Sequence, residues 1–304
     1  MLRGRLPPGP LSHFLGSKRM AAINYHELMH PTELTDDEFR RFCNLIYRAS
    51  GIRIADNKRI LVANRVRRRL RATGIKTFSE YYAFLTSSGD AGEMPRFLDA
   101  ITTNETYFFR DHHHYRWLKD AFFPELATLA SQRKHPRSVR IWSAACSSGE
   151  EPYSIALKFI SSRSLFPGWR VTILGTDLSG AALSQARAGI YDDRAIHLIP
   201  PDERKLYFEE QSGGRRWQLK EEVRSLVTLK RHNLLNPIQE EPFDCVFLKN
   251  VLIYFDTASK EAVVRHVLAA MAPGGYLVIG PTEGIYAMLD PLAKRQPWLY
   301  QKPV

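Results

Sequence analysis

The feature that most constrains the fold is a change in the pattern of apolar residues near residue 137. Beyond that point the chain alternates between strand-length apolar segments at 139–142, 171–177, 243–248 and 276–280 and helix-length segments at 152–161, 179–188 and 259–271. Strands that alternate with helices are typical of a doubly wound α/β domain with a mostly parallel sheet. We therefore expect residues 137–304 to form one such domain.

Residues 203–232 interrupt this alternation. Gly213 and Gly214 stand between apolar triplets at 206–208 and 217–219, and another triplet follows at 227–229. Paired glycines between segments rich in strand-forming residues favour a hairpin. We predict a small β-subdomain, either a hairpin or a three-stranded sheet, inserted at about 203–232 in place of a crossover helix.

The chain before residue 100 shows helical spacing instead. Thr35 precedes three acids, which is the pattern of a helix start, and apolar residues then recur three or four positions apart, as at Phe39 and Phe42. A second helix is expected at about 56–70. The expected boundaries are a flexible leader at 1–30, an all-α domain at 31–100, and a linker with one helix at 101–136. Met20 is an alternative start of the chain.

The positive charge is concentrated in the second predicted helix. The chain has 43 Lys and Arg against 32 Asp and Glu, a formal net charge of +11. The cations of this helix, with no acid after Asp56, are Lys58, Arg59, Arg65, Arg67, Arg68, Arg69 and Arg71. We favour docking on an acidic partner over the alternative of a merely solvated face. Nucleic acid is disfavoured, because no RNA-binding motif is present and no aromatic residue is interleaved with the cations.

Other features narrow the class of protein. No apolar run approaches the ~20 residues that span a bilayer. Cys43, Cys146 and Cys245 are too widely spaced for a zinc site or a disulfide framework, which favours a reducing cytoplasm. The adjacent histidines at 112–114 point in different directions on a helix, so we expect no metal site there.

The first candidate for chemistry follows the first strand of the α/β domain. Residues 143–149 are small, and ligands of doubly wound domains bind beyond the carboxyl ends of the strands. The glycine patterns of dinucleotide and triphosphate sites are absent. Instead Glu150 and Glu151 stand at the turn, where carboxylates repel phosphate and attract a cationic group. The alternative is that either glutamate only stabilises a helix start.

Asp177, at the end of the second strand, is the second candidate. An acid in this position can accept hydrogen bonds from ribose hydroxyls, although it can also cap the following turn. Taken together with the two glutamates, it indicates a nucleoside cofactor with a cationic tail and no phosphates. S-adenosylmethionine fits this description, whereas NAD and ATP fit it poorly. The predicted fold is thus a Rossmann-like domain that binds S-adenosylmethionine.

Four segments resemble the CheR family of chemotaxis receptor methyltransferases. They are residues 102–110, 144–154, 233–234 and 250–255, in the family's order and spacing, and the resemblance extends over roughly residues 33–303. The family transfers the methyl group of S-adenosylmethionine to glutamate side chains of chemoreceptors, forming glutamyl methyl esters. Ser148 and Lys249 replace the Thr and Arg of many members, without removing a group that the reaction needs.

The resemblance implies a cofactor site assembled from several segments. Its predicted cofactor-binding residues are Asn104, Thr106, Arg110, Ala145, Glu150, Glu151, Asp177, Asn233, Leu234, Asn250 and Val251. Ala145 and one of the two glutamates are expected to hold the methionine amino group, and Asp177 the ribose. Asn233 and Leu234 are expected to flank the adenine, and Asn250 to lie near the methyl group.

The resemblance also implies how a substrate is held. Arg110 and Tyr254 are the predicted catalytic residues: Arg110 positions the substrate carboxylate, and Tyr254 orients the substrate. The basic helix is expected to dock on the acidic helical bundle of a chemoreceptor. In some members the β-subdomain grips a receptor tether. We expect a cytoplasmic monomer with no nucleic-acid partner and no metal.

The chemistry of the implied reaction agrees with these residues. A glutamate carboxylate has a pKa near ~4.3, so it is already the nucleophile at neutral pH and needs no general base. Two other hypotheses remain: a CheR-like module that binds S-adenosylmethionine without turnover, and a methyltransferase of another acceptor such as RNA. The presence of Asn104, Arg110, Asp177, Asn250 and Tyr254 together favours the enzyme.

Overall fold

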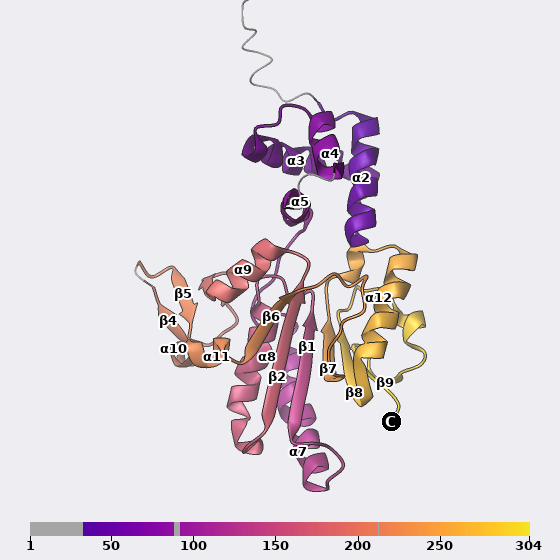
Figure 1. The fold of residues 1–304 in the computed structure, drawn as a ribbon. Helices are drawn as coiled ribbons and strands as arrows, with labels where there is room; N and C mark the ends of the chain where they lie inside the picture. The colour runs from indigo at the N-terminus through magenta and orange to yellow at the C-terminus, as the bar shows by residue number, and fades with distance from the viewer. Residues whose placement is uncertain (1–32, 88–91, 212) are drawn as a thin grey trace, which may run out of the picture.

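The computed structural model describes residues 33–87, 92–211 and 213–304. The predicted leader at 1–30, with the alternative start at Met20, lies outside the described residues. Figure 1 shows a group of helices at one end of an α/β region, with α2 extending down towards that region and α5 seen end-on below α3 and α4. The all-α and α/β regions that the sequence predicts are both present.

The helical region begins with the cap that the sequence predicts. Its elements are α2 (Asp36–Ser50), η1 (Asp56–Lys58), α3 (Arg59–Thr73), α4 (Phe78–Thr86) and α5 (Glu93–Ile101). The hydroxyl of Thr35 accepts a hydrogen bond from the Glu38 N–H at 3.3 Å, and the Glu38 carboxylate accepts one from the Thr35 N–H at 3.0 Å. The second helix starts with a 3-10 turn and runs past residue 70 to Thr73, where Gly74 (φ 74°) ends it.

The core of this region comes from α2 to α5. Phe42 of α2, Val66 of α3, Phe78 of α4 and Phe97 of α5 are completely buried, and their rings and methyl groups pack in one cluster. Burying such a side chain stabilises a fold by about 1.5–3 kcal/mol. Because Val66 and Leu70 point into this core, the cations of α3 are left on the remaining faces of the helix.

The main sheet has the doubly wound topology that the sequence predicts. Its order is β6 (Val227–Arg231), β2 (Arg170–Asp177), β1 (Ser138–Ala144), β7 (Phe243–Leu248), β8 (Met271–Ile279), β10 (Leu299–Gln301) and β9 (Ala293–Gln296). From β6 to β8 the strands are parallel, whereas β10 runs antiparallel to β8 and β9. The chain winds outward from β1 to one side and then to the other, so the strand order reverses between β1 and β7.

Helices cover both faces of this sheet. The elements on one face are α6 (His112–Trp117), the π-helix η2 (Leu118–Phe122), α7 (Phe123–Ser131) and α8 (Glu150–Ser161), and α12 (Thr257–Ala270) covers the other. Ile141 of β1 and Phe247 of β7 pack in the core on the first face. Their neighbours in the same strands, Trp142 and Val246, pack in the core on the second face. This alternation is the period of a strand buried on both sides.

The small sheet differs from the prediction in its boundaries. Its antiparallel strands, in spatial order, are β3 (Ile190–Asp192), β5 (Arg216–Leu219) and β4 (Phe208–Glu210), with α10 (Pro201–Tyr207) before β4 and α11 (Glu221–Arg224) after β5. The triplet at 227–229 belongs to β6 of the main sheet, where Val227 pairs with Ile173 and packs against the core. The subdomain therefore begins before residue 203, with β3.

The segment after α12 is a second difference. The helix ends at Ala270 as expected, but β8 starts at Met271 and contains Pro273, Gly274 and Gly275 instead of following them. The pairing with β7 is irregular here, and the Gly274 N–H (φ 73°) donates to the carbonyl of Lys302 at 3.1 Å. The prolyl and glycyl residues thus form a bulge within the strand.

Candidate functional site

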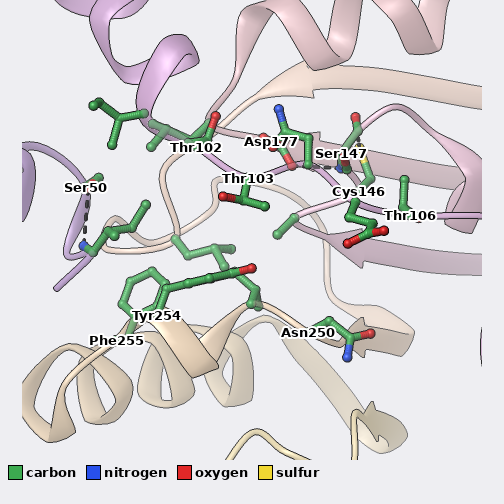
Figure 2. Close-up of a pocket in the computed structure, with 18 of the residues that line it drawn as sticks. Ser50, Thr102, Thr103, Thr106, Cys146, Ser147, Asp177, Asn250, Tyr254 and Phe255 are labelled. Atoms are coloured by element: carbon green, nitrogen blue, oxygen red, sulfur yellow. Dashed lines mark hydrogen bonds between the residues drawn. The ribbon is translucent and has the colours of Figure 1, made fainter. Parts of the chain in front are cut away.

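A cavity of about 280 Å³ lies between the helical region and the carboxyl ends of β1, β2 and β7, where the strand order reverses. Among its lining residues are most of those predicted from the sequence: Asn104, Thr106, Arg110, Ala145, Glu151, Asp177, Asn233, Leu234, Asn250, Val251 and Tyr254. In Figure 2, Asp177 and Ser147 lie on one side, and Tyr254, Phe255 and Asn250 lie opposite them. Residues far apart in sequence therefore surround one space.

The loop after β1 approaches the cavity with an unusual backbone. Ala145 (φ 65°) and Ser147 (φ 51°) are in the left-handed region, as is Gly149 (φ 95°). A Cβ on Gly149 would lie 2.8 Å from the Cβ of Ala186, so a larger residue does not fit there. Left-handed non-glycine residues cost about 1–3 kcal/mol each and cluster at binding sites. The loop therefore presents its backbone groups to the cavity at a cost in stability.

Asp177 holds this loop in place. Its carboxylate accepts hydrogen bonds from the N–H groups of Ser147 and Ser179, both at 2.8 Å, through different oxygens. Burial raises the pKa of Asp177, while these N–H groups oppose the shift. A carboxylate has about four acceptor sites, so each oxygen can accept a further hydrogen bond from a hydroxyl in the cavity.

The structure distinguishes the two adjacent glutamates. Glu151 lines the cavity, where its carboxylate accepts from the Ser143 hydroxyl at 2.8 Å and lies 3.4 Å from the Lys249 ammonium. Glu150 points elsewhere: it is buried, its carboxylate accepts from the Ser148 hydroxyl, and it lines a second cleft beside the β-subdomain. Burial raises the pKa of Glu150 to about 7. The cavity thus receives Glu151 and not Glu150.

Lys249 is a buried cation at the centre of the site. Its ammonium lies 3.4 Å from the Asp111 carboxylate and donates to the carbonyl of Arg110 at 3.0 Å, besides its contact with Glu151. It thereby connects the end of β7 to the starts of α6 and α8. The Arg110 guanidinium donates to the carbonyl of Glu105 at 3.2 Å and lies over the ring of Tyr107 at 5.8 Å. The predicted catalytic arginine is thus held against the cavity wall.

The loop after β7 forms the opposite wall. Asn250 is in the left-handed region (φ 57°), and the buried Glu283 carboxylate accepts from the N–H groups of Asn250 and Leu252, the latter at 2.8 Å. Tyr254, in η4 (Leu252–Tyr254), lines the cavity with 36% of its surface exposed. Our sequence analysis missed Glu283. Its position just after the carboxyl end of β8, on the ligand-binding edge of the sheet, was the available signal.

Asn233 and Leu234, predicted to flank an adenine, follow β6. The Asn233 amide donates to the carbonyl of Ala49 at 2.9 Å, and its oxygen accepts from the Leu235 N–H at 3.1 Å. Asn233 therefore joins the helical region to the α/β region. Leu234 is buried and, with Val251, contributes to the apolar part of the cavity lining.

The predicted docking cations do not form one free surface. Four already have intramolecular partners: Arg59 pairs with Asp36, Arg65 donates to Thr103, Arg67 donates to Asn64, and Arg69 makes two hydrogen bonds with buried Glu93. Lys58 and Arg65 line the cavity, Arg65 and Arg68 line the second cleft, and Lys58, Arg68 and Arg71 are exposed. Arg69 in particular is a structural residue.

Other features of the sequence have structural explanations. Cys146 is buried, which raises the pKa of its thiol well above the usual range, as expected of a packing residue. His114 is buried against Trp298, with ring centroids 4.5 Å apart, and burial lowers its pKa to about 2. Among residues 33–87, 92–211 and 213–304, no three His, Cys, Asp or Glu side chains are grouped to hold a metal ion. Within the same residues, no helix has the length and apolarity of a membrane span.

The chemistry of the cavity fits S-adenosylmethionine. Asp177 has acceptor sites for ribose hydroxyls, and the Glu151 carboxylate faces the space that an ammonium group would occupy. Leu234, Val251 and Phe255 contribute apolar side chains to the cavity lining. The agreement with S-adenosylmethionine therefore depends on the kinds of side chain in the cavity lining, which are carboxylates and apolar groups.

Comparisons with known proteins agree with this chemistry. Residues 104–296 match the model described as "CheR methyltransferase, SAM binding domain", and residues 37–102 match "CheR methyltransferase, all-alpha domain". The chemotaxis protein methyltransferase of Salmonella typhimurium is 36% identical over 88% of this chain and 90% of its own length. That of Escherichia coli is 37% identical over 82% of this chain and 85% of its own.

A comparison with solved structures found lower similarity. An amino pentose methyltransferase from Micromonospora echinaspora, solved with bound S-adenosylmethionine, aligns with a TM-score of 0.29 and 21% identity. The alignment covers 58% of each chain.

Proposed function

Because this chain belongs to the CheR methyltransferase family, we propose that it transfers the methyl group of S-adenosylmethionine to glutamate side-chain carboxylates of chemoreceptors. The products are glutamyl methyl esters and S-adenosylhomocysteine, and the reaction serves sensory adaptation in the cytoplasm. The observation that carries the proposal is the cavity at the reversal point of the sheet, whose lining brings Glu151 and Asp177 together with Arg110 and with Lys58 and Arg65 of the basic helix region.

The proposed reaction needs alignment more than acid–base chemistry. When bound, S-adenosylmethionine supplies an electrophilic methyl group on a positively charged sulfur. The substrate carboxylate is ionised at neutral pH, so a carboxylate oxygen forms the new C–O bond while the sulfur keeps the electron pair of the broken C–S bond. No proton is transferred. The protein must hold the two reactants in line and exclude water.

We assign the alignment to Arg110 and Tyr254. A guanidinium can hold a carboxylate by two parallel hydrogen bonds, and Arg110 reaches the cavity from the segment between the two regions. Tyr254 lines the cavity and remains partly exposed, where its hydroxyl can meet an incoming side chain. The contact of Arg110 with the Glu105 carbonyl moderates its mobility without neutralising its charge.

We assign cofactor binding to the residues that line the cavity. In this proposal Glu151 binds the methionine ammonium group and Asp177 binds the ribose. Glu150 has a structural role. The remaining members of the set are Asn104, Thr106, Ala145, Asn233, Leu234, Asn250 and Val251. The side chain of Asn233 acts through its contact with Ala49, so it supports the adenine wall from behind.

The proposed partner is the acidic helical bundle of a chemoreceptor. Lys58, Arg68 and Arg71, which are exposed, are the docking cations in this proposal, because Arg59, Arg65, Arg67 and Arg69 are engaged within the chain. The β-subdomain offers the edge strands β3 and β4 for a receptor tether, and the enzyme acts as a monomer.

The test is transfer of radiolabelled methyl from S-adenosylmethionine to membranes that contain the organism's own chemoreceptors, followed by mild base. Label released as methanol supports the carboxyl methyl ester. Cofactor binding without incorporation into any receptor would instead support a non-catalytic signalling module, and base-stable label would support another acceptor such as RNA. The Arg110→Ala variant, which should transfer the methyl group slowly, controls for methylation by another enzyme.

A further inference from the structure

A carboxylate of the helical region caps a helix of the α/β region. Asp99, in α5, accepts hydrogen bonds from the N–H groups of Gly180 at 2.8 Å and Ala181 at 3.3 Å, through its two oxygens. These residues begin α9 (Gly180–Ala188), and the Ser179 hydroxyl accepts from the next N–H group, that of Ala182, at 3.1 Å. The first N–H groups of a helix have no partner within it and attract negative charge. Asp99 therefore supplies hydrogen-bond acceptors for the first two N–H groups of α9, which have none within the helix.

This contact connects two walls of the cofactor cavity. On one side, the Thr102 hydroxyl donates to the Asp99 carbonyl at 3.2 Å, and residues 102–107 then line the cavity with Asn104 and Thr106. On the other side, α9 starts just after Asp177, whose carboxylate accepts from the Ser179 N–H. A short chain of hydrogen bonds thus runs from the linker segment to the predicted ribose-binding acid.

A different set of contacts fastens the two regions on the far side of the cavity. Ile52 pairs with Phe255, the Arg53 N–H donates to the Tyr254 carbonyl at 2.8 Å, and the Asn233 amide donates to Ala49. Most of these bonds use backbone groups. The Asp99 contact depends on one side chain, so it can be removed without changing the backbone.

We propose that Asp99 is a positioning residue for the cofactor site: by capping α9 it fixes the spacing between the segment at 102–106 and Asp177. It does not touch the cofactor itself. Its charge contributes a further effect, because Asp99 adds to the rise in the pKa of Asp177 that burial mainly causes. Both effects act on the cofactor-binding wall and leave the mouth of the cavity, at Tyr254, unchanged.

The first test compares Asp99→Ala with Asp99→Asn. Asparagine keeps an oxygen acceptor for the start of α9, whereas alanine has none. We expect Asp99→Ala to raise the Kd and the KM for S-adenosylmethionine at least fivefold, with kcat changed less than twofold. For Asp99→Asn we expect the Kd and the KM for S-adenosylmethionine to lie within about twofold of the wild-type values. If Asp99 only stabilised the fold, Asp99→Ala would lower the fraction of active protein and leave the KM for S-adenosylmethionine unchanged.

The second test removes the donor instead of the acceptor. Gly180 is the first residue of α9, where proline is favoured, and the Ser179 backbone (φ −78°, ψ 113°) is compatible with a following proline. Gly180→Pro deletes the N–H group that makes the shorter of the two hydrogen bonds to Asp99 and leaves that of Ala181, so it should also weaken cofactor binding, by no more than Asp99→Ala does. The double variant with Asp99→Ala should be no weaker than Asp99→Ala alone, since both changes break the same contact.

The matched control is Asp37→Ala, which removes an exposed helical aspartate paired with Arg41 in the same region and should leave the Kd unchanged. The proposal is overturned if Asp99→Ala binds S-adenosylmethionine like wild type, if Asp99→Asn is as weak as Asp99→Ala, or if the Gly180→Pro effect is fully additive. Calorimetric binding needs no receptor. If wild type binds the cofactor but methylates no receptor, the proposed function fails while these variants still decide the role of Asp99.

Discussion

The α/β region and the helical region place their functional groups in different ways. Around the loops after β1 and β7, the cavity residues are fixed by left-handed backbone at Ala145, Ser147 and Asn250 and by buried carboxylates that accept backbone N–H groups. On α3, the cations project from an ordinary helix, and several are already paired within the chain. The first region is built for exact placement of a small ligand. In the proposed function, the second region provides charge that attracts a partner over a distance, where a shift of an ångström matters little.

The largest expected effect is in the α/β region. Asp177→Ala should lower the affinity for S-adenosylmethionine by at least ~100-fold, because it removes the proposed ribose acceptor and also frees the Ser147 N–H that holds the β1 loop. Calorimetry measures the Kd, and circular dichroism checks that the fold is retained. Asp177→Asn, which keeps one acceptor oxygen, should lose less. If Asp177→Ala and wild type bind S-adenosylmethionine with equal affinity, Asp177 is not part of the cofactor site.

The two adjacent glutamates sharpen the comparison within the same loop. We expect Glu151→Gln to weaken cofactor binding by about tenfold, because it removes a carboxylate from the cavity and leaves Lys249 with Asp111 as its remaining acidic partner. Glu150 faces the second cleft, so Glu150→Gln should change the Kd for S-adenosylmethionine less than twofold. The reverse order of the two variants in a Kd measurement would contradict the assignment.

Smaller effects are expected from the helical region. Arg68→Ala and Arg71→Ala should each reduce kcat/KM for the receptor by about threefold to tenfold while leaving the Kd for the cofactor unchanged, since a solvent-exposed charge mainly affects association. The loss should shrink as salt is raised to ~0.5 M. Arg67→Ala is the matched control from the same helix, because Arg67 contacts Asn64 and the ring of Phe78. A receptor defect in Arg67→Ala as large as that in Arg68→Ala would mean that total charge, not the exposed subset, determines docking.

The same contrast explains what the sequence could predict. Strand ends place residues reliably, because the carboxyl ends of parallel strands meet at one edge of a sheet; Asp177 was predicted in this way, whereas Asn250 came from the resemblance to the CheR family. The choice between Glu150 and Glu151 was left open, because it depends on the rotation of α8 against its neighbours. The partners of Arg59, Arg65 and Arg69 were not predictable, because they come from elements distant in sequence.

The boundaries of the β-subdomain were missed for a related reason. The triplet at 227–229 has a strand pattern in either sheet, and only its parallel pairing with β2 assigns it to the main one. The strand β3 (Ile190–Asp192) is short and mixed in character, so nothing in its local sequence marks it. Local pattern therefore indicated a strand at 227–229 but not at β3, and long-range pairing decided which sheet each of them joins.

The last expected effect is on stability and comes from Glu150, because burial raises the pKa of its carboxyl from the ordinary 4.5 to about 7. In the unfolded chain this carboxyl loses its proton at lower pH than in the native state, so the native state binds more protons between pH 4.5 and 7. Stability should therefore fall as pH rises through this window. Glu150→Gln removes the titration, so thermal unfolding at pH 8 should show it to be more stable than wild type by on the order of 1–3 kcal/mol. At pH 4.5 the two should be nearly equal. A constant difference across the pH range would show that packing, not ionisation, distinguishes them, and would leave the contrast between Glu150 and Glu151 to cofactor binding alone.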